Sequence, residues 1–187
     1  FFRRIPRYSQ AARADFVLTE RRNKSDNFVL AMVGDPQTRG LKTDKAVERF
    51  RDIILKDLKD LASDTAEDIY AICLGDLVYN YMTSYDDYMD VLANSPVPMV
   101  SVIGNHDVDQ LNLFETKFGT PYFESYLAPQ NYSFNIGKMH FVVVNDILYN
   151  RQNTKQRYKT GLEDFTLRWL ESDLAHIDKG TTIVLCS

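Results

Sequence analysis

The stretch Met99-Val100-Ser101-Val102-Ile103-Gly104-Asn105-His106-Asp107 joins an apolar run to an amide, an imidazole and a carboxylate. The apolar part predicts a buried strand that ends at a glycine. Two similar junctions precede it, because residues 28–33 lead into Gly34-Asp35-Pro36-Gln37 and residues 69–74 lead into Gly75-Asp76. Three strands that each end in polar residues predict a metal site at the edge of an α/β sheet.

The segments between these strands predict helices, which gives the order strand, helix, strand, helix, strand. Between residues 46 and 61, apolar side chains recur every three or four positions, as in an amphipathic helix: Ala46, Val47, Phe50, Ile53, Ile54, Leu58 and Leu61. A shorter helix is expected near residues 85–93, and Pro96 and Pro98 separate it from the next strand. This alternation favours a parallel sheet with the three carboxyl ends at one edge.

After residue 107 the pattern changes. A short helix is expected over residues 111–118, and the runs 132–136 and 139–144 predict a β-hairpin around Gly137-Lys138. Residues 147–160 are polar and predict an exposed loop that reaches over a site. A second amphipathic helix and a buried strand over residues 181–186 follow; the apolar face of that helix is Leu162, Phe165, Trp169, Leu170, Leu174 and Ile177.

Length and composition indicate one folded domain. The chain has 187 residues, a net charge of −4 and no apolar run near the roughly 20 residues that cross a membrane. The Arg and Lys residues of the first 25 positions are dispersed, so residues 1–26 are expected to be a linker or edge segment. The remaining body, residues 27–187, is acidic, which argues against general nucleic-acid binding. Cys73 and Cys186 lie in apolar runs, where they are expected to be buried thiols.

Asp35 and Asp76 place two carboxylates at neighbouring strand ends. Carboxylates that come close repel each other unless a cation lies between them. Asn105 can add a neutral oxygen without further negative charge, and Asp76 is the better candidate to bridge two metals because it is central in the sequence. The alternative is that the Gly-Asp pairs only form turns or helix caps, and for Asp76 alone the two interpretations are equally good.

His106 is a candidate metal ligand, but two adjacent residues rarely point at the same ion, and Asn105 has the better position. We therefore predict a catalytic role, in which Asp107 holds the imidazole and the ring donates a proton to a leaving oxygen. The alternative is a turn histidine bonded to the backbone. His140 and His176 fall in a strand and on a helix and are expected to be structural or solvated.

In this order and after these strands, the three turns resemble the first three motifs of the calcineurin-like metallophosphoesterase superfamily: Asp35-Pro36-Gln37, Gly75-Asp76 and Gly104-Asn105-His106-Asp107. Residues 132–134 and 137–140 and the helix through residues 169–174 resemble later parts of a bacterial branch with a D-P-Q first motif. The resemblance implies a four-layer β-sandwich flanked by helices. It also implies that a phosphomonoester or phosphodiester is hydrolysed by water activated at two divalent or trivalent metal ions, such as Mn, Fe or Zn.

Carried over by position, the resemblance makes Asp35 and Gln37 ligands of one metal and Asp76 the bridge. Asn105 then binds the second metal, and His106 is the general acid with Asp107 as its partner. Most members of the superfamily have His where this chain has Gln37, and an amide oxygen is a weaker ligand than an imidazole.

Tyr79 stands where purple acid phosphatases supply a tyrosinate to ferric iron, although an aromatic residue there is more often a packing residue. The superfamily also places a histidine just after a strand like residues 181–186 and a later Gly-His-x-His turn. Both are missing, so we expect them just beyond Ser187 and the domain to be incomplete at its C-terminal side.

The resemblance implies a small phosphate-ester substrate and an exported protein, in the periplasm or at the cell surface, with any flanking domains belonging to a longer polypeptide. The acidic body argues against a nucleic-acid partner. A rival hypothesis is a non-catalytic binding module that keeps the fold with an incomplete metal site, as Gln37 and the missing histidines suggest. A nuclease fits the superfamily but not the acidic body.

Overall fold

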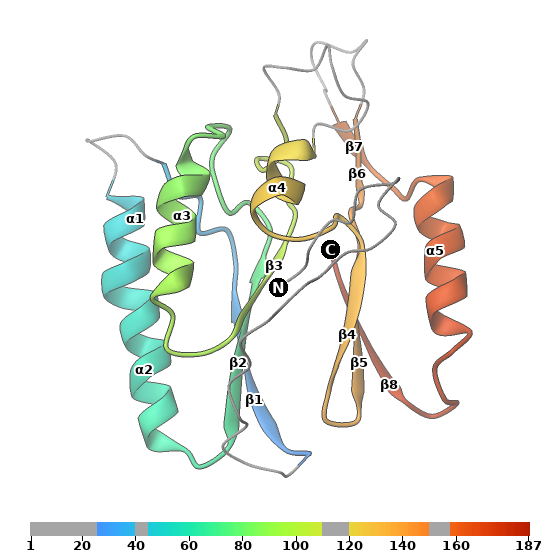
Figure 1. The fold of residues 1–187 in the computed structure, drawn as a ribbon, viewed down its shortest axis with the longest axis horizontal. Helices are drawn as coiled ribbons and strands as arrows, with labels where there is room; N and C mark the ends of the chain where they lie inside the picture. Colours follow the sequence, from blue (N-terminus) through green and yellow to red (C-terminus); the bar gives the residue numbers. More distant parts are fainter. Residues whose placement is uncertain (1–25, 40–44, 110–119, 150–157) are drawn as a thin grey trace, which may run out of the picture.

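A computed structural model describes residues 26–39, 45–109, 120–149 and 158–187 of the chain. The helix expected over residues 111–118, the segment before residue 26 and the middle of the loop expected at 147–160 lie outside the described residues. Figure 1 shows how the described elements are arranged.

Three parallel strands form the first sheet, as the sequence predicts. They are β1 (Phe28–Val33), β2 (Asp68–Leu74) and β3 (Met99–Val102), and they lie in the order β1-β2-β3. Phe28 pairs with Asp68, and Ala71 pairs with Met99. Because all three strands run in the same direction, their carboxyl ends lie at one edge of the sheet.

Helices cover one face of this sheet (Figure 1). α1 (Ala46–Arg49), the π-helical turn η1 (Phe50–Ile54) and α2 (Leu55–Asp64) follow one another without a break, and α3 (Ser84–Ala93) lies beside them. Phe50 and Leu58 are buried, as predicted, but Ile53 is 51% exposed. The wider π-helical turn shifts the phase of the side chains after Phe50, which explains why Ile53 leaves the predicted apolar face.

Alternate side chains of β2 enter two separate cores. Ile69, Ala71 and Cys73 pack toward the helices, whereas Ile72 packs toward a second sheet. This division follows from the two-residue period of a strand that is covered on both faces. The burial predicted for Cys73 is confirmed.

The second sheet contains β4 (Tyr132–Ile136), β5 (Met139–Val143) and β8 (Thr182–Cys186), in the order β4-β5-β8. β4 and β5 form the predicted antiparallel hairpin, and β8 runs parallel to β5. The side chains that join the two sheets form one cluster of buried residues, Ile72, Val102, Ile136, Phe141, Val143 and Cys186. The sheets therefore pack face to face.

The strand predicted over residues 181–186 is present as β8, and Cys186 is buried, but the predicted burial is wrong for the outer face of the strand. Ile183 is 42% exposed and Leu185 is 59% exposed, while Val184 and Cys186 face the first sheet. In the register of this sheet Ile183 lies beside His140 and Leu185 lies beside Val142. β8 is the last strand of the described sheet, so the side chains on its outer face have less cover than those on β5.

α5 (Asp164–Leu174) lies against the outer face of the second sheet (Figure 1) and ends earlier than the predicted apolar pattern. Asp173 accepts hydrogen bonds from Ser133 Oγ at 2.6 Å and from His140 Nε2 at 2.8 Å. The other ring nitrogen of His140 bonds Asn135 Oδ1 at 2.8 Å. His140 is 3% exposed and joins α5 to the sheet through its bond to Asp173. Of the two roles expected for it, structural or solvated, the structural one is confirmed.

One local prediction needs correction, and one short helix was not predicted. The segment expected to be a loop begins and ends as an antiparallel pair of short strands, β6 (Ile147–Tyr149) and β7 (Tyr158–Thr160). A short helix that the sequence analysis missed, α4 (Pro121–Tyr126), starts at a proline. Proline is common at the first position of a helix because its missing N–H would be unpaired there in any case.

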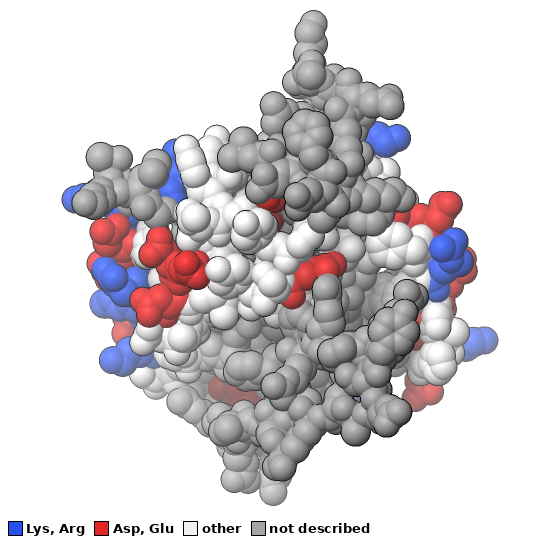
Figure 2. Space-filling view, turned by 45° about the horizontal axis from the view of Figure 1, so that its top comes forward, with Lys and Arg blue, Asp and Glu red and all other residues white. Residues whose placement is uncertain are grey.

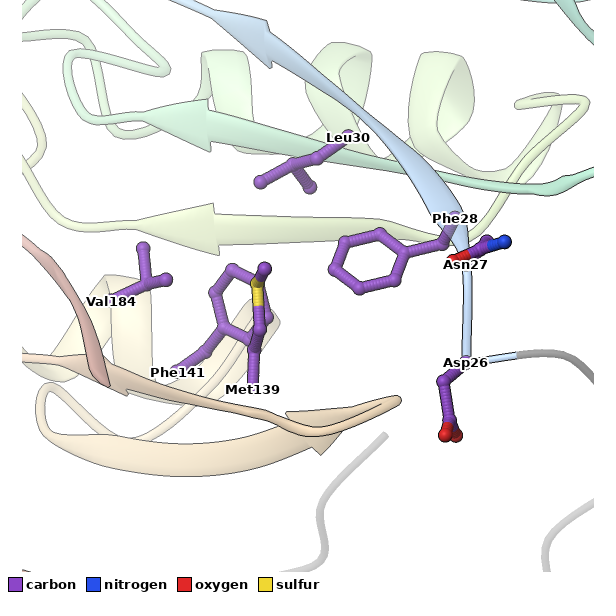
Figure 3. Close-up of a pocket in the computed structure, with 7 residues that line it drawn as sticks. All are labelled: Asp26, Asn27, Phe28, Leu30, Met139, Phe141 and Val184. Atoms are coloured by element: carbon purple, nitrogen blue, oxygen red, sulfur yellow. The ribbon is translucent and has the colours of Figure 1, made fainter. Parts of the chain in front are cut away.

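A pocket of about 520 Å³ lies between the two sheets, and Figure 3 shows the residues that line it. Phe28 and Leu30 of β1 point into it from one side, and Met139, Phe141 and Val184 point into it from the other. The pocket lies at the amino end of β1, whereas the three polar turns follow the carboxyl ends of the strands. It is thus separate from the predicted site.

The described elements form a mixed α/β arrangement. Figure 1 shows α1, α2 and α3 on one side, the two sheets in the middle and α5 on the other side. Within the described residues, none of the helices combines the length and the apolar character needed to span a bilayer.

Candidate functional site

The three polar turns meet at the carboxyl edge of the first sheet through backbone hydrogen bonds. Gln37 N donates to Asp76 O at 2.8 Å and Thr38 N donates to Leu77 O at 2.9 Å, which joins the first turn to the second. Asn80 N donates to His106 O at 3.1 Å, which joins the second turn to the third. The structure therefore brings the three segments together, as their position after parallel strands predicts.

These turns contain every non-glycine residue with positive φ in the described part of the chain. The φ angles are 44° at Asp35, 43° at Gln37, 49° at Asp76 and 59° at Asn80. The left-handed region is unfavourable for residues with a Cβ atom, although Asn and Asp tolerate it better than most. Strain that is concentrated in one place indicates that the positions of these side chains matter more than local stability.

Gly104 is required by the close approach of the second and third turns. A Cβ atom at this position would lie 2.2 Å from Asp76 N and 2.4 Å from Asp76 Oδ1. Gly75, with φ +83°, contacts Gly104 from the other turn, where a Cβ atom would lie 3.0 Å from Gly104 Cα. The two glycines thus allow the Asp76 carboxylate to lie directly against the third turn.

The Asp76 side chain lies between the other two turns. Its Oδ1 accepts a hydrogen bond from His106 N at 2.9 Å. Its Oδ2 is 3.5 Å from Gln37 Nε2 and 3.9 Å from His106 Nε2. The side chain is only 12% exposed, so one carboxylate connects the first, second and third motifs in a largely covered position.

The His106 ring is held from two directions by residues of the second turn. Nδ1 is 3.0 Å from Asn80 Oδ1. The ring also stacks on Tyr79, with centroids 4.3 Å apart and planes inclined by 19°. The guanidinium carbon of Arg39 lies 3.7 Å from the centroid of the Tyr79 ring. Tyr79 therefore acts as a packing residue between a cation and the imidazole.

Asp107 is buried below the turn, where it fixes the backbone. Its carboxylate accepts hydrogen bonds from Val78 N at 2.9 Å and from Gly104 N at 2.8 Å, and Tyr85 OH donates to its backbone oxygen at 3.1 Å. The sequence analysis expected Asp107 to orient the His106 ring. The structure gives that contact to Asn80, because the Asp107 carboxylate turns toward backbone N–H groups.

Burial raises the pKa of Asp107 to about 7, and the negative charge of Asp76 adds to the rise. The hydrogen bonds from Val78 and Gly104 act in the opposite direction, since they favour the charged carboxylate. The protonated form is thus favoured more strongly in the folded chain than in the unfolded chain, where the pKa is about 3.8.

Asp107 should therefore make the stability of the metal-free chain depend on pH. Because its folded pKa is raised, its contribution is full below about pH 4 and is lost as the pH rises through about 7. We expect the Tm of the wild type minus that of Asp107→Asn to be largest near pH 4 and to shrink toward pH 8. Calorimetry in a chelating buffer measures this difference, and a difference that grows with pH would contradict a pKa of Asp107 that is raised by burial.

Residues 28–186 match the family described as calcineurin-like phosphoesterase. The chain belongs to the calcineurin-like phosphoesterase family. A search of curated proteins found no match to the chain. The family match spans all three turns and both sheets, which confirms the resemblance inferred from the motifs. The more detailed inference of a bacterial branch with a D-P-Q first motif stays a prediction.

Calcineurin-like phosphoesterases are hydrolases of phosphoric esters that generally use divalent metal ions, so the donor atoms of this chain can be compared with that requirement. Asp35 and Asp76 supply carboxylate oxygens, and Gln37 and Asn105 supply amide oxygens. In the described residues, no group of three or more His, Cys, Asp or Glu side chains is placed to hold a metal. The donors are of the right kind for hard divalent ions but include few charged ligands.

The other histidines lie away from these turns. His140 is bound to Asp173 and Asn135 in the second sheet, and His176 Nδ1 bonds Ser172 O at the end of α5. The histidines that the resemblance places after β8 stay a prediction.

The sequence analysis missed two residues that shape the site, Asn80 and Arg39. Asn80 carried one usable signal, because an asparagine in a strand-to-helix loop tolerates positive φ and can accept a hydrogen bond. Arg39 had no such signal, since its contact with Tyr79 depends on the tertiary arrangement of two turns.

Figure 2 views the molecule with the carboxyl edge of the first sheet turned forward. Lys and Arg side chains gather over the helices at the two flanks, together with Asp and Glu. The described surface between them is mostly uncharged and carries a few acidic groups. The part of this face that is visible therefore lacks the basic stripe that typically accompanies nucleic-acid binding.

Proposed function

We propose that the chain hydrolyses small phosphomonoesters or phosphodiesters with the help of two divalent or trivalent metal ions held at the three turns. The observation that carries this proposal is the Asp76 carboxylate, which lies between the Gln37 amide and the His106 ring. A shared carboxylate at the meeting point of three turns is the position from which two cations can be bridged. The same proposal includes the four-layer sandwich, with helices outside and two sheets inside.

Asp35 and Gln37 would hold one ion, Asp76 would bridge both, and Asn105 would hold the second. When bound, such ions supply Lewis acidity toward phosphoryl oxygens and lower the pKa of a water molecule. Because the Gln37 and Asn105 amides are neutral, they would reduce the Lewis acidity of the ions less than additional carboxylates would. The amide of Gln37 would present Oε1 to the ion after rotating about its last side-chain bond, since Nε2 now faces Asp76.

His106 would be the general acid for the leaving oxygen. Its Nε2 lies on the side of Asp76, 3.9 Å from Oδ2, so the nitrogen that faces the proposed ligand set is the one that can exchange a proton. With Nδ1 bound to Asn80, the ring keeps this orientation. A cationic imidazole in this place would also attract the negative oxygens of a phosphate ester.

The proposed substrate is a small phosphate ester and not a nucleic acid, because the body of the chain after residue 26 is acidic. We also propose, from the resemblance alone, that the protein is exported to the periplasm or the cell surface.

A substrate panel tests the proposed function. The chain is assayed with p-nitrophenyl phosphate, bis-p-nitrophenyl phosphate and other phosphate esters in the presence of Mn²⁺, Fe²⁺ or Zn²⁺, and again after chelation. Metal-dependent turnover supports the proposal. Absence of turnover across esters and metals, in a folded polypeptide that also carries the histidines implied by the resemblance, would refute it.

We expect Asp76→Asn to lower metal-dependent turnover by at least about 10²-fold, because removing the charge leaves no bridging carboxylate between two cations. The matched control is Asp60→Asn, since Asp60 is exposed on α2 and forms a surface ion pair with Lys56. The control should keep its activity. Isothermal titration with Mn²⁺ measures the affinity of both variants, and unchanged binding in Asp76→Asn would contradict the assigned bridge.

The second candidate is a non-catalytic binding module with an incomplete metal site. It is favoured by the small number of charged ligands among the described residues, where no cluster of three His, Cys, Asp or Glu is placed to hold a metal. It predicts that at most one metal ion binds weakly and that none of the tested esters is turned over. Titration of the bound metal per chain distinguishes the two functions.

A further inference from the structure

We propose that Asn80 and Tyr79 are positioning residues for His106. Asn80 determines that Nδ1 is the ring nitrogen that keeps its hydrogen in both the neutral and the cationic ring, and Tyr79 holds the plane of the ring. This inference rests on the proposed role of His106 and adds two residues that the three motifs do not contain. Both come from the turn after β2, whereas His106 comes from the turn after β3. The turn that supplies the bridging Asp76 would therefore also set the direction in which His106 can transfer a proton.

The chemistry of the Asn80 contact determines the tautomer. Its Oδ1 lies 3.0 Å from His106 Nδ1, and an amide oxygen can only accept a hydrogen bond. Nδ1 must therefore carry a hydrogen whether the ring is neutral or cationic. Nε2 is consequently the ring nitrogen that is left free of this contact, and it faces Asp76 Oδ2 at 3.9 Å.

The backbone of the second turn supports this contact. Asn80 N donates to His106 O at 3.1 Å, so the main chain and the side chain of Asn80 both bind the same histidine. The φ angle of 59° at Asn80 is unfavourable for most side chains but is tolerated by asparagine and glycine. The left-handed backbone conformation of Asn80 lets its main chain and its side chain both bind His106.

Tyr79 restricts the rotation of the His106 ring. Its stacking on His106, with centroids 4.3 Å apart, opposes rotation about the bond that joins the imidazole to Cβ. Asn80 and Tyr79 thus fix the imidazole by a hydrogen bond in its plane and by contact with its face. Because Asn80 is neutral, it orients the ring without the charge that Asp107 would have supplied.

Nuclear magnetic resonance of the metal-free chain tests the tautomer independently of activity. With ¹⁵N-labelled histidine at a pH above the titration of the ring, the wild type should show Nδ1 of His106 protonated and Nε2 unprotonated. Asn80→Gly keeps the positive φ but removes the acceptor, so the population should move toward Nε2–H. An Asn80→Gly spectrum with the same His106 tautomer as the wild type would overturn the proposal. Asn94→Gly, on the surface at the end of α3, is the matched control and should change nothing.

Leaving groups test the consequence for catalysis. A badly oriented acid should matter most for esters whose leaving group needs a proton, so Asn80→Gly should lower kcat for phenyl phosphate by about tenfold or more. For 2,4-dinitrophenyl phosphate the loss should stay below about threefold, with KM little changed for both esters. Tyr79→Phe should resemble the wild type because it keeps the stacked ring, whereas Tyr79→Leu should show the same selective loss.

The outcomes separate this inference from the proposed function. Equal losses for both esters, or no loss for either, would refute the positioning role even if the wild type is an active phosphoesterase. An inactive wild type would refute the proposed function. It would also refute any effect of Asn80 and Tyr79 on catalysis by His106. The tautomer measurement would still decide whether Asn80 controls the ring.

Discussion

Replacing His106 with alanine should lower kcat for metal-dependent hydrolysis of p-nitrophenyl phosphate by about 10² to 10⁴-fold, the usual contribution of a positioned general acid. The reason is geometric, because the ring holds Nε2 toward Asp76 while its other nitrogen is bound by Asn80. The fold should survive, since the backbone amide of His106 still donates to Asp76 Oδ1 in the variant. Steady-state kinetics with the metal at saturation measures the loss.

The control for this variant is His176→Ala. His176 is exposed at the end of α5 and bonds only a nearby backbone oxygen among the contacts described, so its removal should leave kcat unchanged. If His106→Ala kept more than about a third of the wild-type kcat with substrates that have poor leaving groups, His106 would not be the acid.

Replacing Gly104 with alanine should both destabilise the chain and weaken metal binding at the site. The added methyl group would lie 2.2 Å from Asp76 N, which is backbone and cannot move away as a flexible side chain could. The second and third turns must separate, and we expect a loss of about 3 kcal/mol in the free energy of unfolding. For a chain of this size, that loss lowers the Tm by roughly 6–12 °C.

The matched control is Gly34→Ala, because a Cβ atom there would meet nothing within 4 Å. Thermal unfolding of both variants should show a change only for Gly104→Ala, together with weaker metal binding. A Gly104→Ala chain with the Tm and the metal affinity of the wild type would show that the two turns do not need to touch.

The architecture of the first sheet could be predicted because local pattern and topology agree. Apolar runs mark the strands, the period of the intervening helices is clear, and parallel strands must place their carboxyl ends together. The hairpin of β4 and β5 was predictable for the same reason. The β6 and β7 pair was not, since three-residue strands in a polar segment leave no periodic signal. The phase shift at η1 likewise depends on packing and not on composition.

The residues that belong to the site could be predicted from the sequence, but the contacts among their side chains could not. Each turn could be found from the residues that follow a strand, but which carboxylate touches which ring depends on side-chain directions across three segments. Asp107 illustrates the difference. Its neighbour in sequence is His106, yet its carboxylate binds Val78 N and Gly104 N, while Asn80 from another turn binds the imidazole.

The most direct test of a metal site at the three turns is anomalous diffraction from crystals of the chain saturated with Mn²⁺. The account predicts two anomalous peaks, one on each side of Asp76, with carboxylate or amide oxygens about 2.0–2.4 Å away. Asp35 should bind one ion and Asn105 the other. Peaks only elsewhere on the surface, with none at Asp76 in crystals of a saturated chain, would contradict it.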